Sequence, residues 1–352
     1  MTAAVGVQKR LKRTAKRALA GSLYTSGLLS LLMHRRFRQQ CLVLTYHRVL
    51  SRDAVEKTCS SPGIVVTRET FECHLRLLKR HFRVLTLAEF ESHVRTQMPF
   101  PSGACLLTFD DGWLDTYTEA WPLLRRYGVP AVVFLPVSYI GTGRMFWQEE
   151  LTYLLVAARR AATNTTATMS RLRDIAAEHA IDVAFDEPIV HDDILQAVQR
   201  KKGSDSTSIV RLIESLAQLV TAGERHAAAD AFLTWDMARE MAADGVTFGA
   251  HSVTHRIMTT LTPAELVDEV RGSRDRLRQE LPAAVESFSY PNGSWDNAVR
   301  AEVVRQGFAI SFTTAPGPVS VHDDRFAIHR VNVHQDATST EGLFLARVSG
   351  IL

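Results

Sequence analysis

Residues 106–113 read LLTFDDGW, an apolar run that ends in two adjacent acids, a glycine and a tryptophan. The run is typical of a buried strand, and neighbouring residues on a strand point to opposite sides. Asp110 and Asp111 therefore cannot both be ordinary solvated charges just beyond a core. Two interpretations are open at this point. Either one acid caps a helix that begins near Trp113 while the other is exposed, or the pair performs catalysis.

Similar runs recur along the chain and alternate with amphipathic helical stretches. The predicted strands are residues 41–46, 82–87, 105–109, 131–136, 246–251, 287–290, 309–314 and 326–333. About seven or eight strands separated by helices favour a distorted parallel (β/α) barrel of the TIM type, an α/β fold, over an open sheet. Catalytic residues of such barrels lie at the carboxyl ends of the strands, where Asp110 and Asp111 stand.

The start of one helix is marked in the sequence. Thr262 is a predicted N-cap, Pro263 occupies the first turn, and Glu265 is the reciprocal partner in a capping box. Residues 142–234 break the alternation, because they contain helical runs such as RLRDIAAEHA (171–180) and no convincing strand. They are interpreted as a mainly helical insertion that shapes access to the barrel, or as a separate helical domain. The predicted barrel is then formed by residues 41–141 and 235–352.

Composition limits the possible functions. The chain has 352 residues, 46% of them hydrophobic, which is enough for a large core. Its net charge of +3 hides an asymmetry, since residues 1–40 hold nine Lys and Arg and no acid. The rest of the chain is mildly acidic and is not typical of a nucleic-acid binder. The four cysteines form no CxxC pair and indicate free thiols in a reducing compartment, with two bridges as the alternative.

Residues 1–40 form a basic amphipathic segment. The Lys and Arg side chains of residues 9–17 share one helical face, a pattern typical of a helix on an anionic membrane surface. The apolar run 18–33 that follows is shorter than the roughly 20 residues of a membrane span. A secretory signal or a solvated basic helix packed on the body are the alternatives. The segment predicts a cytoplasmic location, peripheral at the inner membrane.

A second polar strand end is FGAHSVTH, residues 248–255. His251 and His255 are four residues apart, so both imidazoles project to one side if the chain turns helical after the strand. Two histidines and one carboxylate leave coordination positions open, as catalytic rather than structural metal sites do. This donor set suits zinc and permits cobalt or nickel.

The motifs TFDDG (108–112), HSVTH (251–255) and YPNG (290–293), in that order, resemble those of the NodB-homology polysaccharide deacetylases, carbohydrate esterase family 4. The resemblance covers roughly residues 41–335 apart from the insertion. It implies a distorted barrel, a divalent metal that is usually zinc, and hydrolysis of N-acetyl groups on sugars. It further implies that Asp110 is the general base and that Asp111, His251 and His255 are the metal ligands.

The sequence departs from the family pattern in two places. Ser289 stands where the family often has an arginine, so the charged partner of the base is absent or supplied from elsewhere. The family's late acid-and-tryptophan motif and its final histidine, the general acid, have only approximate counterparts, and His329 and His334 are the candidates. His47 is a further candidate at the same rim, although a hydrogen-bonded rim histidine is the simpler interpretation.

The loop Tyr290–Asn292, which includes Pro291, matches the family and is predicted to offer a backbone N–H to the oxyanion. The favoured function is removal of N-acetyl groups from a polysaccharide or oligosaccharide of the N-acetylglucosamine type, in envelope or exopolysaccharide metabolism. The alternatives are hydrolysis of another nonpeptide C–N bond by the same machinery, and a non-catalytic relative that binds glycans or membranes.

Overall fold

The computed structural model describes residues 2–163, 165–183, 185, 191–202, 205–221, 231–281 and 286–352. Contacts within the chain divide it into two compact units. The first comprises Met1–Glu56, Pro62–Gly141 and Phe232–Leu352, and the second comprises Lys57–Ser61 and Thr142–Ala231. The predicted basic segment of residues 1–40 is thus part of the first unit.

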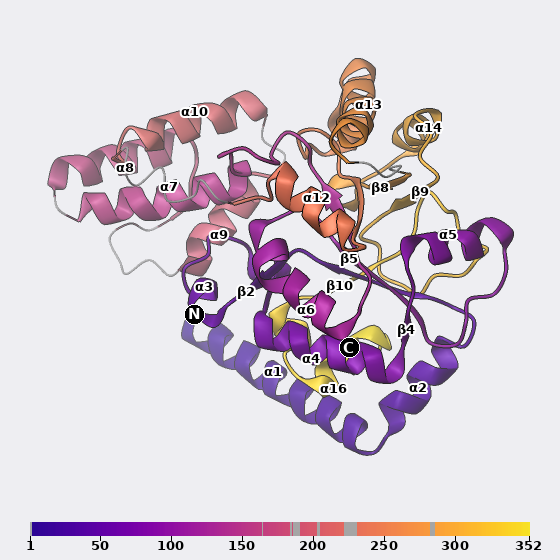
Figure 1. The fold of residues 1–352 in the computed structure, drawn as a ribbon. Helices are drawn as coiled ribbons and strands as arrows, with labels where there is room; N and C mark the ends of the chain where they lie inside the picture. The colour runs from indigo at the N-terminus through magenta and orange to yellow at the C-terminus, as the bar shows by residue number, and fades with distance from the viewer. Residues whose placement is uncertain are drawn as a thin grey trace. The chain divides into compact units, whose positions relative to one another are not determined.

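A parallel sheet forms the centre of the first unit (Figure 1). Its strands are short, every pairing is parallel, and most of their residues are buried, as expected for strands covered on both faces. In spatial order they are β10 (Val331–Asn332), β1 (Leu42–Tyr46), β5 (Ala104–Phe109), β6 (Val132–Leu135), β7 (Thr247–Ala250), β8 (Ser287–Ser289) and β9 (Ile310–Phe312). The short strand β4 (Arg83–Val84) pairs with the beginning of β5.

The two ends of this sheet approach each other. Phe312 of β9 forms a parallel bridge with Ile328, which lies just before β10 in the chain. The N–H of Thr313 donates to the carbonyl of Ile328, and the N–H of Ile328 donates to the carbonyl of Ser311. Because β10 itself pairs with β1, the chain between β9 and β10 brings the sheet round toward a barrel. The predicted fold class, a distorted (β/α) barrel with a mainly helical insertion, is confirmed.

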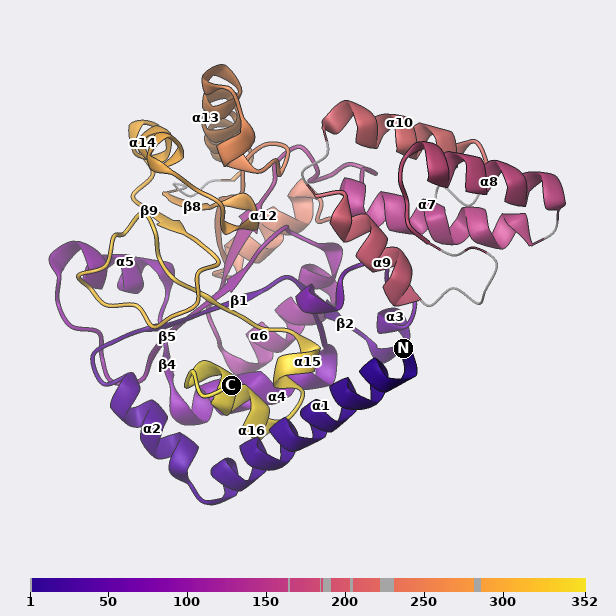
Figure 2. The same cartoon turned by 180° about the vertical axis from the view of Figure 1, so that it is seen from behind.

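Helices lie around the outside of the sheet (Figures 1 and 2). The capping box predicted at Thr262 and Glu265 is confirmed at the start of α13, and a second one joins Thr86 and Glu89. The helices are α4 (Arg68–His81), α5 (Leu87–Thr96), α6 (Trp121–Tyr127), α12 (Trp235–Ala243), α13 (Pro263–Glu280), α14 (Asn297–Arg305), α15 (Gln335–Thr338) and α16 (Glu341–Val348). A separate two-stranded parallel sheet, β2 (Arg48–Leu50) with β3 (Val65–Thr67), followed by α3 (Arg52–Val55) after β2, was not predicted from the sequence.

The N-terminal segment forms two helices, α1 (Thr2–Thr25) and α2 (Leu28–Arg36), with a break at Gly27, whose φ is 73°. Helix α1 packs along α16 so closely that a Cβ on Gly342 would lie 2.7 Å from the carbonyl oxygen of Ala20. The Tyr24 hydroxyl donates to Glu341 at 2.5 Å, and Arg13 pairs with Asp336 at 2.6 Å. Of the interpretations left open by the sequence, a basic helix packed on the body describes α1.

Within the described residues, no helix is long and apolar enough to cross a membrane.

The second unit is helical and has its own apolar core. Its described helices are α7 (Trp147–Ala162), α8 (Thr166–Glu178), α9 (His191–Arg200) and α10 (Ser206–Ala217). Leu155, Leu172 and Leu216 are fully buried where α7, α8 and α10 meet. The helical pattern of this stretch is explained by its core, because each helix buries its apolar face against the other helices of the unit.

A buried histidine in α4 makes the stability of the first unit depend on pH. His74 accepts from the Tyr46 hydroxyl (3.0 Å), and its other ring nitrogen donates to the carbonyl of Thr338 (2.8 Å). Burial lowers the pKa of His74 from 6.5 to about 4. The unfolded chain therefore takes up this proton first as the pH falls, so stability is lost between about pH 6.5 and pH 4, by about 3 kcal/mol in total.

We expect His74→Gln to flatten this dependence. Urea unfolding at several pH values between 7 and 4 should show a smaller loss of unfolding free energy in the variant than in the parent. Parallel curves for the two proteins would contradict the assignment.

Candidate active site

The polar strand ends found in the sequence meet at one edge of the barrel. Asp110 directly follows β5, and its N–H donates to the carbonyl of Tyr46 on β1. His251 directly follows β7, and its N–H donates to the carbonyl of Leu135 on β6. Because all these strands are parallel, their carboxyl ends share one face, where barrel enzymes carry out their chemistry.

Asp111, His251 and His255 form a group that could hold a metal ion. Oδ1 of Asp111 lies 3.5 Å from Nε2 of His251 and 3.3 Å from Nε2 of His255, and the donor atoms of all three residues lie within 4.8 Å of one another. Asp111 and His251 are buried, and the His255 side chain is 20% exposed. Two imidazole nitrogens and one carboxylate oxygen suit a catalytic divalent metal that keeps open positions.

The backbone at Asp111 is left-handed, with a φ of 75°, and Gly112 follows with a φ of 67°. A non-glycine residue in this region carries strain that is typical of functional sites. The turn aims Oδ1 at the histidines, while the Trp113 indole N–H donates to Oδ2 at 2.9 Å. A Cβ on Gly112 would lie 2.4 Å from the side chain of Leu135, so this position requires glycine.

Two residues that the sequence did not identify support Trp113. The Arg48 guanidinium lies 4.4 Å from the centre of the Trp113 ring, within cation–π distance. Asp115 holds Arg48 in place, with a 2.8 Å ion pair, and also accepts the N–H of Val49. Trp113 of the LLTFDDGW motif thus holds the Asp111 carboxylate in position at the metal group.

The two histidines are oriented by different means. Nδ1 of His251 donates to the Ser289 carbonyl at 2.7 Å, which leaves Nε2 free to face the metal group. His255 sits in a tight turn with a φ of 58°, and its N–H donates to the Ser252 hydroxyl. The buried Glu269 carboxylate of α13 accepts the N–H groups of Val253 and Thr254, at 2.7 and 2.8 Å, and so fixes the loop between the ligands.

Arg330 is the charged partner of Asp110, which the sequence left unassigned. Its guanidinium binds both carboxylate oxygens of Asp110, at 2.8 and 2.7 Å, and the two side chains are 0% and 3% exposed. The same guanidinium donates to the Ser289 hydroxyl and to the carbonyl of Thr313. The arginine expected at position 289 is therefore replaced by Arg330, which directly precedes β10, and the smaller Ser289 bonds to it.

The pKa of Asp110 follows from this pairing. Burial raises the pKa of Asp110, but the positive charge of Arg330, followed by that of His251, outweighs burial, so the pKa lies below its ordinary value. The group is therefore ionised at neutral pH, as a general base must be.

His47 is a third histidine near the acid pair, besides His251 and His255. Burial lowers the pKa of His47, and the next largest influences come from Asp111 and Asp110, which raise it. Within the described residues its Nδ1 is buried and has no hydrogen-bond partner. His47 is therefore not the satisfied rim histidine that was the simpler interpretation of the sequence.

His329 and His334 show no contact with the acid pair in the described residues. In the described part of the chain, neither residue forms a hydrogen bond or ion pair with Asp110 or Asp111. His329 packs against Gly317, and the charges that act on His334 are those of Arg347 and Asp336. Their predicted role as general acid gains no support from this geometry.

The loop after β8 offers one donor for an oxyanion. The Tyr290 N–H is already bonded to the carbonyl of Phe312, and Pro291 has no N–H, so neither can contribute a backbone donor. Asn292 has a φ of 57°, and a Cβ on the adjacent Gly293 would lie 2.1 Å from the Thr314 hydroxyl. Of the three predicted residues, only Asn292 keeps its backbone N–H available.

Comparison with known proteins identifies the family of the chain. The chain matches the sequence model of the polysaccharide deacetylase family over residues 97–183 and 212–311. It belongs to the polysaccharide deacetylase family and is an enzyme of that class. The resemblance found from the motifs is thereby confirmed.

Three similar proteins illustrate the relationship. The protein named "Putative polysaccharide deacetylase YxkH" from Bacillus subtilis is 22% identical over 293 residues, which are 83% of this chain and 70% of that protein. A poly-beta-1,6-N-acetyl-D-glucosamine N-deacetylase from Staphylococcus epidermidis is 31% identical over 113 residues, 30% of this chain and only 39% of that protein. The structure of IcaB from Ammonifex degensii shares the fold, with a TM-score of 0.55, 18% identity, and coverage of 88% of this chain and 97% of that one.

Proposed function

We propose that the protein is a metal-dependent hydrolase that removes N-acetyl groups from a polysaccharide or oligosaccharide of N-acetylglucosamine, in envelope or exopolysaccharide metabolism. The observation that carries the proposal is the metal group of Asp111, His251 and His255 beside the ionised pair of Asp110 and Arg330. The similarity to a poly-beta-1,6-N-acetyl-D-glucosamine N-deacetylase supports the choice of substrate class.

The residues at the barrel edge supply the groups that amide hydrolysis requires. A divalent metal bound by Asp111, His251 and His255 would supply Lewis acidity. Asp110 would accept a proton from the attacking water, with Arg330 holding the carboxylate ionised and oriented. The Asn292 N–H would donate to the developing oxyanion, and a neutral His47 would pass the proton taken up by Asp110 on to the departing amine.

We infer one divalent ion per chain, with zinc preferred over cobalt and nickel for this donor set. His251→Ala removes one ligand and should lower the metal content of the purified protein to well below one ion per chain, because two donors bind far more weakly than three. The measurement is elemental analysis after dialysis. His329→Ala is the matched control, since His329 lies outside the group and should leave metal content unchanged. Full occupancy in His251→Ala would overturn the ligand set.

The substrate class is tested by acetate release. The metal-loaded protein is incubated with poly-β-1,6-N-acetylglucosamine, with short N-acetylglucosamine oligomers, and with simple amides and imides. Acetate release from the glycans supports the proposal. Turnover of amides or imides alone would point to another nonpeptide C–N bond, and no turnover of any substrate would point to a non-catalytic relative.

We also propose that the protein works on the cytoplasmic side. Cys41 and Cys105 are buried at the beginning of neighbouring strands and are unbridged, as are the other two cysteines. Unbridged thiols are typical of reducing compartments. Separation of cell fractions, followed by immunodetection, tests this location, and recovery from the extracytoplasmic fraction would contradict it.

A further inference from the structure

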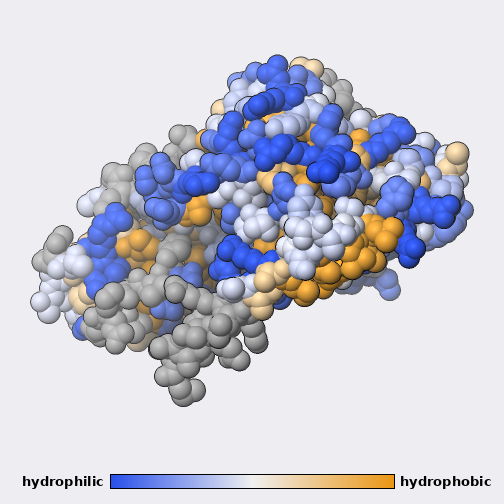
Figure 3. Space-filling model, turned by 90° about the horizontal axis from the view of Figure 1, so that it is seen from below, coloured by the Kyte–Doolittle hydropathy of each residue, from blue (hydrophilic) through white to orange (hydrophobic). Residues whose placement is uncertain are grey.

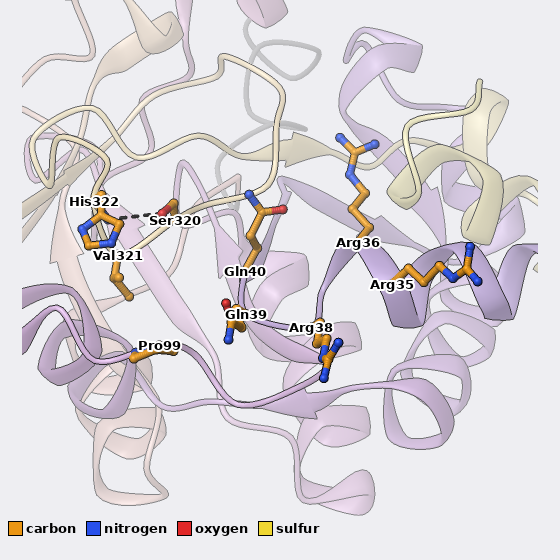
Figure 4. Close-up of a pocket in the computed structure, with 9 residues that line it drawn as sticks. All are labelled: Arg35, Arg36, Arg38, Gln39, Gln40, Pro99, Ser320, Val321 and His322. Carbon is orange, nitrogen blue, oxygen red and sulfur yellow. Dashed lines mark hydrogen bonds between the residues drawn. The ribbon is translucent and has the colours of Figure 1, made fainter.

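A hollow lies at the end of the barrel opposite the acid pair. It has a volume of about 490 Å³ and is lined by Arg35 and Arg36 at the end of α2, by residues 38–40 that lead to β1, by Pro99 and by residues 320–322 (Figure 4). The N–H of Cys41 donates to the carbonyl of Val319, which places this hollow beside the amino end of β1. The acid pair follows the carboxyl end of the adjacent strand, so the two sites are separate.

The lining of this hollow is basic. Arg35, Arg36 and Arg38 all contribute to it, and no Asp or Glu is among the lining residues. Arg36 is fixed by a 2.7 Å hydrogen bond to the Ser349 carbonyl. Arg35 and Arg38 are exposed, and within the described residues neither forms an ion pair with an acid. The three guanidinium groups point in different directions (Figure 4), so they spread positive charge over this face, and exposed guanidinium groups of this kind pair well with phosphates.

Exposed apolar side chains accompany the basic hollow. Leu28 and Leu31 of α2 are 41% and 50% exposed, and Met98, which precedes Pro99 of the lining, is 61% exposed. Leu28, Leu31 and Arg35 are spaced by three and four residues, so they share one face of α2. Viewed from the side of α1 and α2, apolar residues form a band next to hydrophilic ones (Figure 3).

We propose that this face binds the surface of an anionic phospholipid membrane, with Arg35 and Arg38 pairing with headgroup phosphates and the leucines of α2 in the interfacial layer. Charge complementarity calls for a phosphate, and a free phosphate ion would not require the exposed leucines beside it. The arginines that contact the membrane are then Arg35 at the end of α2 and Arg38 just after it. Arg13 and Arg17 of the basic face instead bond to Asp336 and Ser339 on the barrel. Membrane binding of this kind does not depend on the proposed reaction.

The test is co-sedimentation of the full chain with vesicles of phosphatidylcholine, with and without phosphatidylglycerol. Deleting residues 1–40 would remove the packing of α1 on α16, so point variants are used. The parent should sediment only with the anionic vesicles. Arg35→Ala/Arg38→Ala should lower the partition coefficient about 30-fold, at roughly fivefold for each arginine. Leu28→Ser/Leu31→Ser should lower it at least about 10-fold, because the apolar contact is lost.

Arg271→Ala/Arg278→Ala on α13 is the matched control, since it removes the same charge from a distant helix and should sediment as the parent does. Equal sedimentation of the α2 arginine variant and this control would overturn the proposal, and so would failure of the parent to bind anionic vesicles. A third arm titrates inorganic phosphate into the parent and the arginine variant. If phosphate raised the unfolding temperature of the parent but not of the arginine variant, and the parent did not bind vesicles, the ligand of the arginines would be a free phosphate instead.

Discussion

Asp110→Asn is expected to lower kcat by about 100-fold or more, because it removes the proton acceptor without removing a metal ligand. The sequence alone would predict an otherwise intact protein. The structure adds a cost, since Arg330 remains charged and loses its buried carboxylate partner, so the free energy of unfolding should also fall by several kcal/mol. Activity and stability therefore need to be measured together, as kcat on a glycan substrate and as urea unfolding of the same preparation.

The double variant Asp110→Asn/Arg330→Met separates these two effects. It removes the unpaired charge and should recover much of the lost stability while remaining inactive. Metal content should stay near that of the parent in both variants, because Asp111 and the histidines are retained. If Asp110→Asn kept a rate within a few-fold of the parent, the general base would have to be another residue.

Arg330→Met should destabilise the fold by about 3–5 kcal/mol, the effect expected when one partner of a buried pair is removed. The carboxylate of Asp110 would then be buried without compensation, so its pKa should rise. Because the base must be ionised to act, the rate of hydrolysis falls when the pH is lowered through its pKa. In the variant this fall should begin at a higher pH than in the parent. Urea unfolding measures the first effect, and the pH dependence of kcat/KM measures the second.

Arg300→Met is the control for this variant. Arg300 is also paired with an acid, Asp324, but each of these two side chains is more than a third exposed. Neither belongs to the active site. Exposed pairs contribute little, so this change should cost less than about 1 kcal/mol and leave the pH profile unchanged. If Arg330→Met also cost less than about 1 kcal/mol and left the pH profile unchanged, the pairing of Arg330 with Asp110 would contribute neither to stability nor to catalysis.

Much of the site could be predicted from the sequence because its residues belong to short local motifs. Asp110, Asp111, His251 and His255 all lie at or just after the ends of predicted strands, and the parallel arrangement brings strand ends together without further information. The prediction of the fold was successful for the same reason, since strand and helix patterns alternate outside residues 142–234.

The remainder depends on contacts between distant parts of the chain, which no local pattern contains. Arg330 is 220 residues from Asp110, and Arg48 is 67 residues from Asp115. His47 could have been preferred over His329 and His334 as the general acid only if the pairing of β1 with β5 had been known, because that pairing places His47 near Asp110. The signal for Arg330 was present, because it lies in an apolar strand-like run where a charge needs a buried partner.

Ser289 contacts both halves of the site, since its carbonyl accepts from His251 while its hydroxyl meets Arg330 and Asp110. An arginine at position 289 would compete with Arg330 for the same carboxylate and the same space, so the two arrangements exclude each other in one molecule. A family survey that requires arginine before the Tyr-Pro step would discard every chain built in this way. Such a chain is better recognised by a serine there together with an arginine directly before the last strand.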